Sequence, residues 1–348
     1  MRHDFSNDYS EGAHEAILSA LERTNREQGG TYGLDRYSEE ARERIRSLLE
    51  RPESAVHFLT GGTQVNATLL TAALRPHQGV LCARTGHINV HEAGAVEAGG
   101  HKVLPLPHTE GKVDAATVER AFIAHYTDAT AEHMVQPGAL YISHPTELGA
   151  VYSKGELRAL RQVCGQYNAK LYLDGARLGC ALTAEGCDVT LRDLAELTHA
   201  FTIGGTKMGA LFGEALVIND PALDQDFRYI LKQRGALLAK GRLLGLQFLT
   251  LFTDGLYFDL ARHANAQAAR IREGLKEKGA PLLSQAPTNQ VFAILERDSL
   301  KSLEGEFGFA FWQKMDDRRD AVRFCTSWAT PPAAVDALLD AIPKQGEN

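Results

Sequence analysis

The sequence has few cysteines, no long apolar run and no surplus of positive charge. Its five cysteines among 348 residues form no Cys-x-x-Cys pair, which indicates reduced thiols and a cytoplasmic location. No apolar run reaches the roughly 20 residues that a membrane-spanning helix needs, and the first residues show no apolar core of a secretory signal. Lysine and arginine total 37 against 44 acidic residues, so neither nucleic acid nor an anionic membrane is expected as the main partner.

Short β-rich runs alternate with helical patterns over the first part of the chain. The expected strands are mostly apolar on both faces, as parallel strands covered by helices are; they span residues 55–60, 79–84, 102–106, 139–143, 170–173 and 201–203. Helical stretches cover 37–50, 64–74, 115–125 and 153–167, and the last opens with Ser153 and Glu156 in capping-box spacing. The alternation predicts an α/β fold with a doubly wound, mainly parallel sheet. No G-x-G-x-x-G follows the first strand, which argues against a dinucleotide-binding enzyme.

The pattern changes towards the C-terminus. A further strand at 212–218 could run antiparallel to the others, and residues 221–279 indicate two or three helices. Strands at 290–295 and 322–327 and a closing helix at 331–342 then predict a small α+β unit. We therefore expect a large domain over residues 1–249 and a smaller C-terminal domain over residues 250–348.

One pair of residues carries the most chemical information. Asp174 closes an apolar run, and Lys207 follows thirty-three residues later, directly after Thr206 in a glycine-rich turn. Pyridoxal phosphate (PLP) chemistry needs such a pair. The lysine forms a Schiff base with the cofactor, and the carboxylate keeps the pyridine nitrogen protonated so that the ring accepts electrons. Singly, a surface lysine and a helix-capping aspartate are the plainer interpretation; together they favour a PLP site.

Two further motifs fit such a site. Gly61, Gly62 and Thr63 lie between an expected strand and a helix, where free backbone N–H groups bind anions; we expect them to hold the cofactor phosphate. His87 follows another expected strand, where its ring could stack on the pyridine. His87 and His91 also have a spacing that metal ligands on a helix face use, but no third ligand is evident and we expect no metal.

Two arginines are candidates for binding a carboxylate. Arg177 comes three residues after Asp174, and Arg323 lies within the expected strand at 322–327. A planar guanidinium suits a substrate carboxylate, and a charge inside an apolar strand needs a partner or a ligand. An internal salt bridge is an equally simple explanation for either arginine taken alone.

With these motifs, the chain resembles the low-specificity threonine aldolase / β-eliminating lyase family of fold-type I PLP enzymes. The resemblance runs from residue 4 to residue 328 and is most specific at 61–63, 173–178, 206–207 and at His87. It implies a PLP site formed by Gly61, Gly62, Thr63, His87, Asp174, Arg177, Thr206, Lys207 and Lys240. It implies an amino acid substrate bound by Ser6, Tyr32, Arg177 and Arg323. Family members share active sites between subunits, so we expect a homodimer or homotetramer in which Lys240 or Arg242 reaches a neighbour's cofactor phosphate.

The resemblance implies an aldehyde-lyase that cleaves a threonine-like β-hydroxy-α-amino acid to glycine and an aldehyde. Lys207, Asp174 and His87 are the implied catalytic residues, with His87 as the first choice for the base that takes the hydroxyl proton. Where well-known threonine aldolases have a second histidine near the hydroxyl, this sequence has Glu147, which is our second choice. A β-eliminating lyase or an aminotransferase acting on another amino acid, and a non-catalytic PLP-fold binding protein, are the alternatives.

Overall fold

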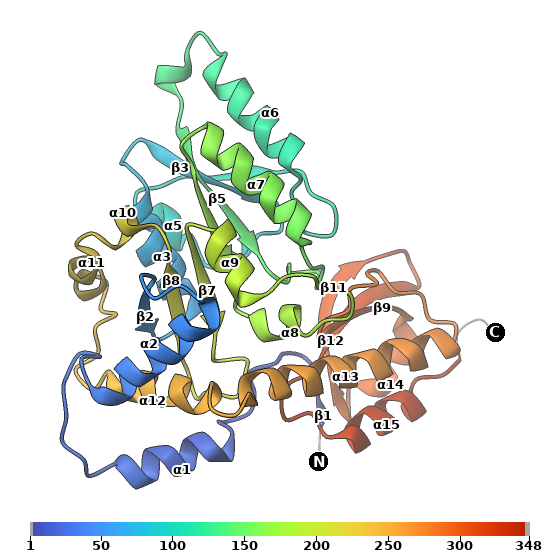
Figure 1. Cartoon of the computed structure of the whole chain (residues 1–348). Helices are drawn as coiled ribbons and strands as arrows, with labels where there is room; N and C mark the ends of the chain where they lie inside the picture. Colours follow the sequence, from blue (N-terminus) through green and yellow to red (C-terminus); the bar gives the residue numbers. More distant parts are fainter. Residues whose placement is uncertain (1–2, 345–348) are drawn as a thin grey trace.

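A seven-stranded sheet forms the centre of the molecule in the computed structural model, which describes residues 3–344 (Figure 1). In spatial order its strands are β2 (Ala55–Leu59), β8 (Glu214–Ile218), β7 (Ala200–Gly204), β6 (Lys170–Asp174), β5 (Gln136–Ser143), β3 (Gln78–Ala83) and β4 (Val103–Leu106). All neighbours run parallel except β8, which is antiparallel to both β2 and β7.

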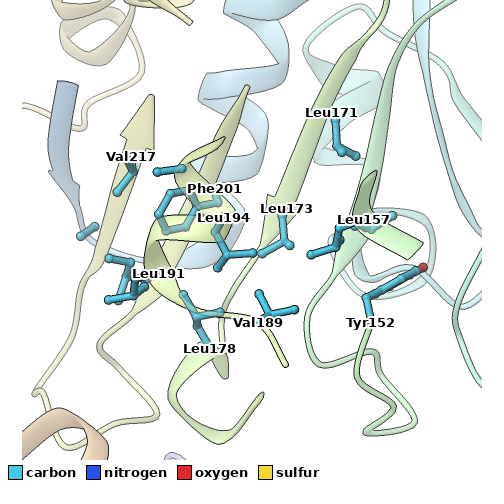
Figure 2. Close-up of a cluster of buried hydrophobic side chains, with 14 of the residues drawn as sticks. Tyr152, Leu157, Leu171, Leu173, Leu178, Val189, Leu191, Leu194, Phe201 and Val217 are labelled. Atoms are coloured by element: carbon cyan, nitrogen blue, oxygen red, sulfur yellow. The ribbon is translucent and has the colours of Figure 1, made fainter. Parts of the chain in front are cut away.

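Both faces of the sheet are covered because its strands are apolar on both faces. Along β6, Leu171 and Leu173 belong to one core while Tyr172 belongs to the other, as the two-residue period of a strand requires. Helices α1 (Glu15–Thr24), α2 (Arg36–Leu49), α6 (Ala115–Tyr126), α7 (Lys154–Gln166), α8 (Leu178–Leu182), α9 (Leu191–Leu197), α12 (Arg242–Leu251) and α13 (Leu256–Glu277) contribute to the first core. Figure 2 shows part of it, with Leu173 between Leu194 and Leu157.

The opposite face has a smaller core. Its helices are α3 (Gly62–Ala73), α4 (His87–Val90), α5 (Ala95–Ala98), α10 (Pro221–Asp224) and α11 (Phe227–Gln233). Helix α3 contributes Val65, Leu69 and Leu70, at helical spacing, and Phe227 of α11 is fully buried against this face. A short 3₁₀ turn (Ala131–His133) precedes β5. These buried apolar residues fix α3, and with it the glycine turn at residues 61–62 where the helix starts, against the sheet.

A second, antiparallel sheet lies at the C-terminal end of the chain. Its order is β11 (Ala310–Lys314), β12 (Arg319–Cys325) and β9 (Gln290–Glu296), and α14 (Arg297–Leu303) and α15 (Pro332–Ala341) accompany it. Helix α13 runs from the large sheet to this unit (Figure 1) and contributes residues to the cores of both.

The N-terminal segment, residues 3–8, begins beside this small sheet rather than beside the large one. Strand β1 (His3–Asp4) pairs in parallel with β10 (Phe307–Gly308), and Phe5 is buried in the small unit's core. Local sequence does not reveal this long-range strand pairing. The expected division into a large domain over residues 1–249 and a smaller one over residues 250–348 stays a prediction.

Most predicted elements are present. Every expected strand occurs with ends within three residues, including the antiparallel β8, and the expected α/β fold with a small α+β unit is confirmed. The capping box of α7 is also present: Ser153 Oγ accepts from the N–H of Glu156, whose carboxylate accepts from the N–H of Ser153 at 2.7 Å. The region 221–279 contains four helices, where we expected two or three. None of the helices within residues 3–344 is both long and apolar enough to span a membrane.

Candidate active site

A cavity of about 240 Å³ opens at the carboxyl ends of the parallel strands. Its walls come from the turn after β2, the loops after β3, β5 and β6, and the segment between β7 and β8. Open α/β sheets bind their ligands at this end of the strands. Nine of the residues predicted from the sequence line it: Gly61, Gly62, Thr63, His87, Glu147, Asp174, Arg177, Thr206 and Lys207.

Two glycines let the loops that carry Asp174 and Lys207 approach each other. A Cβ at Gly175 would collide with the carbonyl of Thr202, and a Cβ at Gly204 would collide with the carbonyl of Ala176. Each contact joins the end of β6 to the end of β7. Only glycine leaves room for these backbones to lie so close, and the result is that two segments distant in sequence share one cavity.

The turn before α3 has the features of an anion site. Gly61 is the N-cap of α3 and has no side-chain group capping the helix, so the first N–H groups of the helix remain available to a ligand. A Cβ at Gly61 or Gly62 would meet no atom within 4 Å. Thr63 follows and also lines the cavity. The start of α3 therefore has open space beside Gly61 and Gly62.

Lys207 is surrounded by groups that affect its charge. Burial lowers the pKa of the Lys207 amine, and the guanidinium of Arg177 lowers it further. Burial raises the pKa of the neighbouring Glu214 to about 8, and Thr206 Oγ1 donates to Glu214 Oε1 at 2.9 Å. The Tyr9 ring centre lies 5.8 Å from Lys207 Nζ. A lowered pKa favours the neutral amine, which is the nucleophile that Schiff-base formation requires.

Asp174 is held in one orientation by several donors. Its Oδ2 accepts from the Tyr141 hydroxyl at 2.7 Å and from Asn66 Nδ2 at 3.0 Å. Its Oδ1 accepts from the N–H of Ala176 at 2.9 Å. The residue is 7% exposed and yet lines the cavity. A fixed carboxylate that reaches a ligand cavity can hold a proton on a ring nitrogen.

A hydrogen-bonded group surrounds His87. Its Nδ1 lies 2.8 Å from Glu92 Oε1, and its backbone N–H donates to Glu147 Oε1 at 2.9 Å. Ser143 Oγ donates to the same Glu147 oxygen at 2.6 Å. Burial raises the pKa of the Glu147 carboxyl. Both candidates for the base, His87 and Glu147, thus lie side by side in the cavity wall.

Arg177 reaches the cavity but is already paired. Its Nε donates to Asp8 Oδ2 at 2.6 Å and its Nη2 donates to Asp8 Oδ1 at 3.0 Å. Burial alone would raise the pKa of Asp8, but the positive charges of Arg177 and Lys207 lower it to about 2. The internal salt bridge that we considered for Arg177 is therefore present, because a buried cation needs a counter-charge. Because Arg177 still lines the cavity, its predicted contact with a substrate carboxylate stays a prediction.

Arg323 and Ser6 lie next to each other but outside the cavity wall. Arg323 Nη2 donates to the Ser6 carbonyl at 3.0 Å and Nη1 donates to Gln290 Oε1 at 3.3 Å. Arg323 Nε is buried and has no hydrogen-bond partner among the described residues. The predicted contact of Ser6 and Arg323 with a substrate carboxylate stays a prediction.

Tyr32 and Lys240 do not reach the cavity of their own chain. Tyr32 has a left-handed φ of 56° and donates its N–H to the Ala239 carbonyl at 3.2 Å; its ring lies 4.6 Å from Lys232 Nζ. Lys240 lies in the exposed turn before α12. Neither residue lines the cavity of its own chain, and the predicted site role of Tyr32 stays a prediction. A role in a neighbouring subunit's site stays a prediction.

Sequence reasoning missed several residues of the site. These are Asp8, Asn66, Glu92, Tyr141, Ser143 and Glu214. Asn66 could have been found, since it lies one turn into α3 from the glycine turn, and Glu92 follows His87 closely. Asp8 and Glu214 gave no local signal, because each becomes important only through a partner far away in the sequence.

The antiparallel β8 beside a parallel sheet, and a buried lysine in one cavity with a strand-end aspartate, define the class of fold-type I PLP enzymes. The chain belongs to the beta-eliminating lyase family, whose pattern matches residues 4–298. It is 30% identical over 342 residues to the low specificity L-threonine aldolase of a Pseudomonas species, covering 96% of this chain and 95% of that protein.

Solved structures agree with this assignment. A threonine aldolase from Leishmania major is 43% identical, with a TM-score of 0.95 and 98% of both chains covered. An aspartate aminotransferase variant from Thermus thermophilus is 17% identical, with a TM-score of 0.71 over 98% of this chain and 90% of that one; it shares the fold. The family and the fold predicted from the sequence are thus confirmed.

Proposed function

We propose that this protein is a PLP-dependent aldolase that cleaves a threonine-like β-hydroxy-α-amino acid to glycine and an aldehyde. The observation that carries the proposal is that Lys207, Asp174 and His87 line one cavity beside an uncapped glycine turn. Similarity to threonine aldolases over nearly the whole chain supports this reaction over the other reactions of the class.

The residues present fit PLP. The uncapped start of α3, with open space at Gly61 and Gly62, suits the phosphate. The buried amine of Lys207 suits the aldehyde carbon, and the carboxylate of Asp174 suits the pyridine nitrogen. His87 supplies a ring in the cavity wall that can stack on the cofactor.

The reaction would use these residues as follows. Bound there, PLP would supply an electron sink for the pair released when the Cα–Cβ bond breaks. Asp174, oriented by Tyr141 and Asn66, would keep a proton on the pyridine nitrogen. His87, or Glu147 as the second choice, would take the β-hydroxyl proton while the aldehyde forms. Arg177, which lines the cavity, and Arg323 would attract the substrate carboxylate by their positive charge.

Chemical trapping tests the proposal. Borohydride should fix PLP to Lys207, as mapped by peptide mass spectrometry, and Lys207→Ala should abolish trapping and turnover. Lys276→Ala, an exposed lysine on α13, is the control and should keep both. Threonine should yield glycine and acetaldehyde. Release of a keto acid would indicate elimination or transamination instead, and PLP trapping without any product would indicate a binding protein.

We further propose that the active form is a homodimer or homotetramer in which Lys240 serves a neighbour's site. The exposed position of Lys240, away from its own cavity, supports this arrangement. Mixing Lys207→Ala and Lys240→Ala proteins under conditions that exchange subunits should restore activity that neither has alone. If light scattering shows a monomer with full activity, the shared-site arrangement is wrong.

A further inference from the structure

Glu92 lies behind His87, on the side away from the ligand cavity. His87 lines the cavity, whereas Glu92 is not among the described residues that do, and the Glu92 side chain has no exposed surface. The carboxyl is held from two directions: its Oε1 lies 2.8 Å from His87 Nδ1 and 2.6 Å from Asn66 Nδ2. Its Oε2 is buried with no hydrogen-bond partner among the described residues. Burying a carboxyl costs free energy unless its partners compensate, so the contacts of Glu92 indicate its role.

The orientation of Asn66 fixes the direction of these hydrogen bonds. Asn66 Oδ1 accepts from the Tyr172 hydroxyl at 2.6 Å, so its NH₂ group faces the two carboxylates of Glu92 and Asp174. An ionised carboxylate oxygen is an acceptor only. With Glu92 ionised, His87 Nδ1 carries the hydrogen of this bond, and in the neutral ring the lone pair is left on Nε2.

We propose that Glu92 is a positioning residue that holds His87 as the Nδ1–H tautomer, so that Nε2 is the base for the β-hydroxyl proton. Nε2 takes that proton as the oxygen–hydrogen bond breaks, and the ring becomes an imidazolium beside the Glu92 carboxylate. Carboxylate–imidazole pairs in hydrolases use the same principle, in which the carboxylate selects the tautomer and stabilises the cation. The catalytic part of this inference rests on the proposed aldolase function; the tautomer does not.

Other groups near His87 act on different atoms. The Glu147 carboxylate accepts from the His87 backbone N–H, the His91 ring centre is 5.5 Å from the His87 ring centre, and Asp174 is connected through Asn66. Of Glu92 and these three groups, only Glu92 lies within hydrogen-bond distance of a ring nitrogen of His87. Removing the Glu92 acceptor should therefore change the tautomer without removing the other charges.

The tautomer is measurable in the cofactor-free protein by ¹⁵N NMR of the histidine rings, with the His87 signal assigned from a His87→Asn variant. The wild type should show Nδ1–H. Glu92→Met removes both acceptor oxygens and should shift His87 to Nε2–H, the form preferred by an unconstrained imidazole. Glu92→Gln keeps an amide oxygen where the two donors meet and should retain Nδ1–H. Glu97→Gln, an exposed carboxyl nearby, is the control and should change nothing.

The kinetic consequence follows the tautomer. Glu92→Met should lower kcat by about 100-fold, in the range that a misplaced general base costs, with KM and PLP affinity within about threefold of wild type. Glu92→Gln should fall between Glu92→Met and wild type. A merely structural Glu92 would instead weaken PLP binding or folding in both variants and leave the tautomer unchanged.

Two results would overturn the inference. One is a wild-type His87 that carries its hydrogen on Nε2. The other is a Glu92→Met protein that keeps the Nδ1–H form or retains wild-type kcat. Failure of the proposed function is a separate result: if threonine and related amino acids give no aldehyde, the NMR comparison still decides whether Glu92 sets the His87 tautomer.

Discussion

The buried pair of Asp8 and Arg177 joins the N-terminal segment to the strand that carries Asp174, and its removal should be costly. Lowering the pKa of Asp8 from 3.8 to about 2 corresponds to about 2 kcal/mol of folding free energy. Asp8→Asn also leaves the Arg177 guanidinium buried without its counter-charge, a change that costs about 3–5 kcal/mol in other proteins. We expect the variant to lose roughly 2–5 kcal/mol in its free energy of unfolding.

Urea unfolding of the cofactor-free protein, followed by tryptophan fluorescence, measures this loss. Asp254→Asn is a matched control, because Asp254 is exposed with a φ of 51° that asparagine tolerates. Since the folded pKa of Asp8 lies below the unfolded value, its contribution is complete above pH 4 and should disappear as the pH falls from about 4 to about 2. A loss below 0.5 kcal/mol in the free energy of unfolding of Asp8→Asn would refute the reasoning. So would an Asp8→Asn/Arg177→Met double variant whose loss is as large as the summed losses of the two single variants.

Four further substitutions test the site. Asp174→Asn should lower kcat at least 100-fold in an aldehyde-release assay, because the charge that holds the pyridine proton is lost. Gly62→Ala should keep or slightly raise stability, by up to about 1 kcal/mol, while spectroscopic titration shows PLP affinity reduced about tenfold or more by the added methyl group. Burial raises the pKa of the Glu147 carboxyl, so its protonation should lower kcat/KM at a pH above the range where glutamate usually titrates. Glu147→Gln should abolish that acidic fall in the pH profile of kcat/KM. Arg323→Lys should raise KM for the amino acid by at least 30-fold, about 2 kcal/mol, with PLP binding retained.

Each of these has a result that contradicts it. Near-normal turnover of Asp174→Asn would place the partner of the pyridine nitrogen elsewhere. Unchanged PLP affinity in Gly62→Ala would move the phosphate away from the start of α3. An acid limb that persists in Glu147→Gln belongs to another group, with His87 as the first candidate. Unchanged kinetics in Arg323→Lys would leave Arg323 as a structural residue that binds the Ser6 carbonyl.

The order of helices and strands could be predicted because it depends on local chemistry. The runs at β5 and β6 are apolar on both faces, which only a sheet covered on both sides can accommodate. The capping box at Ser153 set the start of α7. The pairing of β1 with β10 escaped prediction because two-residue strands carry no periodicity, and their pairing joins positions some three hundred residues apart.

The core of the site could also be predicted, since its residues sit where strands end. Asp174 is the last residue of β6, Gly61 follows β2 and His87 follows β3, and the carboxyl ends of parallel strands meet at one edge. Two of the predicted site residues have partners that the local sequence did not indicate. Arg177 is paired with Asp8 of the N-terminal segment, and Tyr32 packs beside the turn before α12.

The sequence by itself determined strands suited to a covered parallel sheet, and it indicated the chemistry through a lysine and an aspartate at a spacing that PLP enzymes use and a glycine turn before a helix. These are properties of residue type and short-range spacing. Only the tertiary structure decided how the charges are shared, because pairing, burial and hydrogen-bond direction depend on atoms brought together by folding. It gave Arg177 its counter-charge in Asp8 and raised the pKa of Glu214 by burial beside Lys207. It also placed the Glu92 carboxyl within hydrogen-bond distance of His87 Nδ1, the contact on which the proposed tautomer depends.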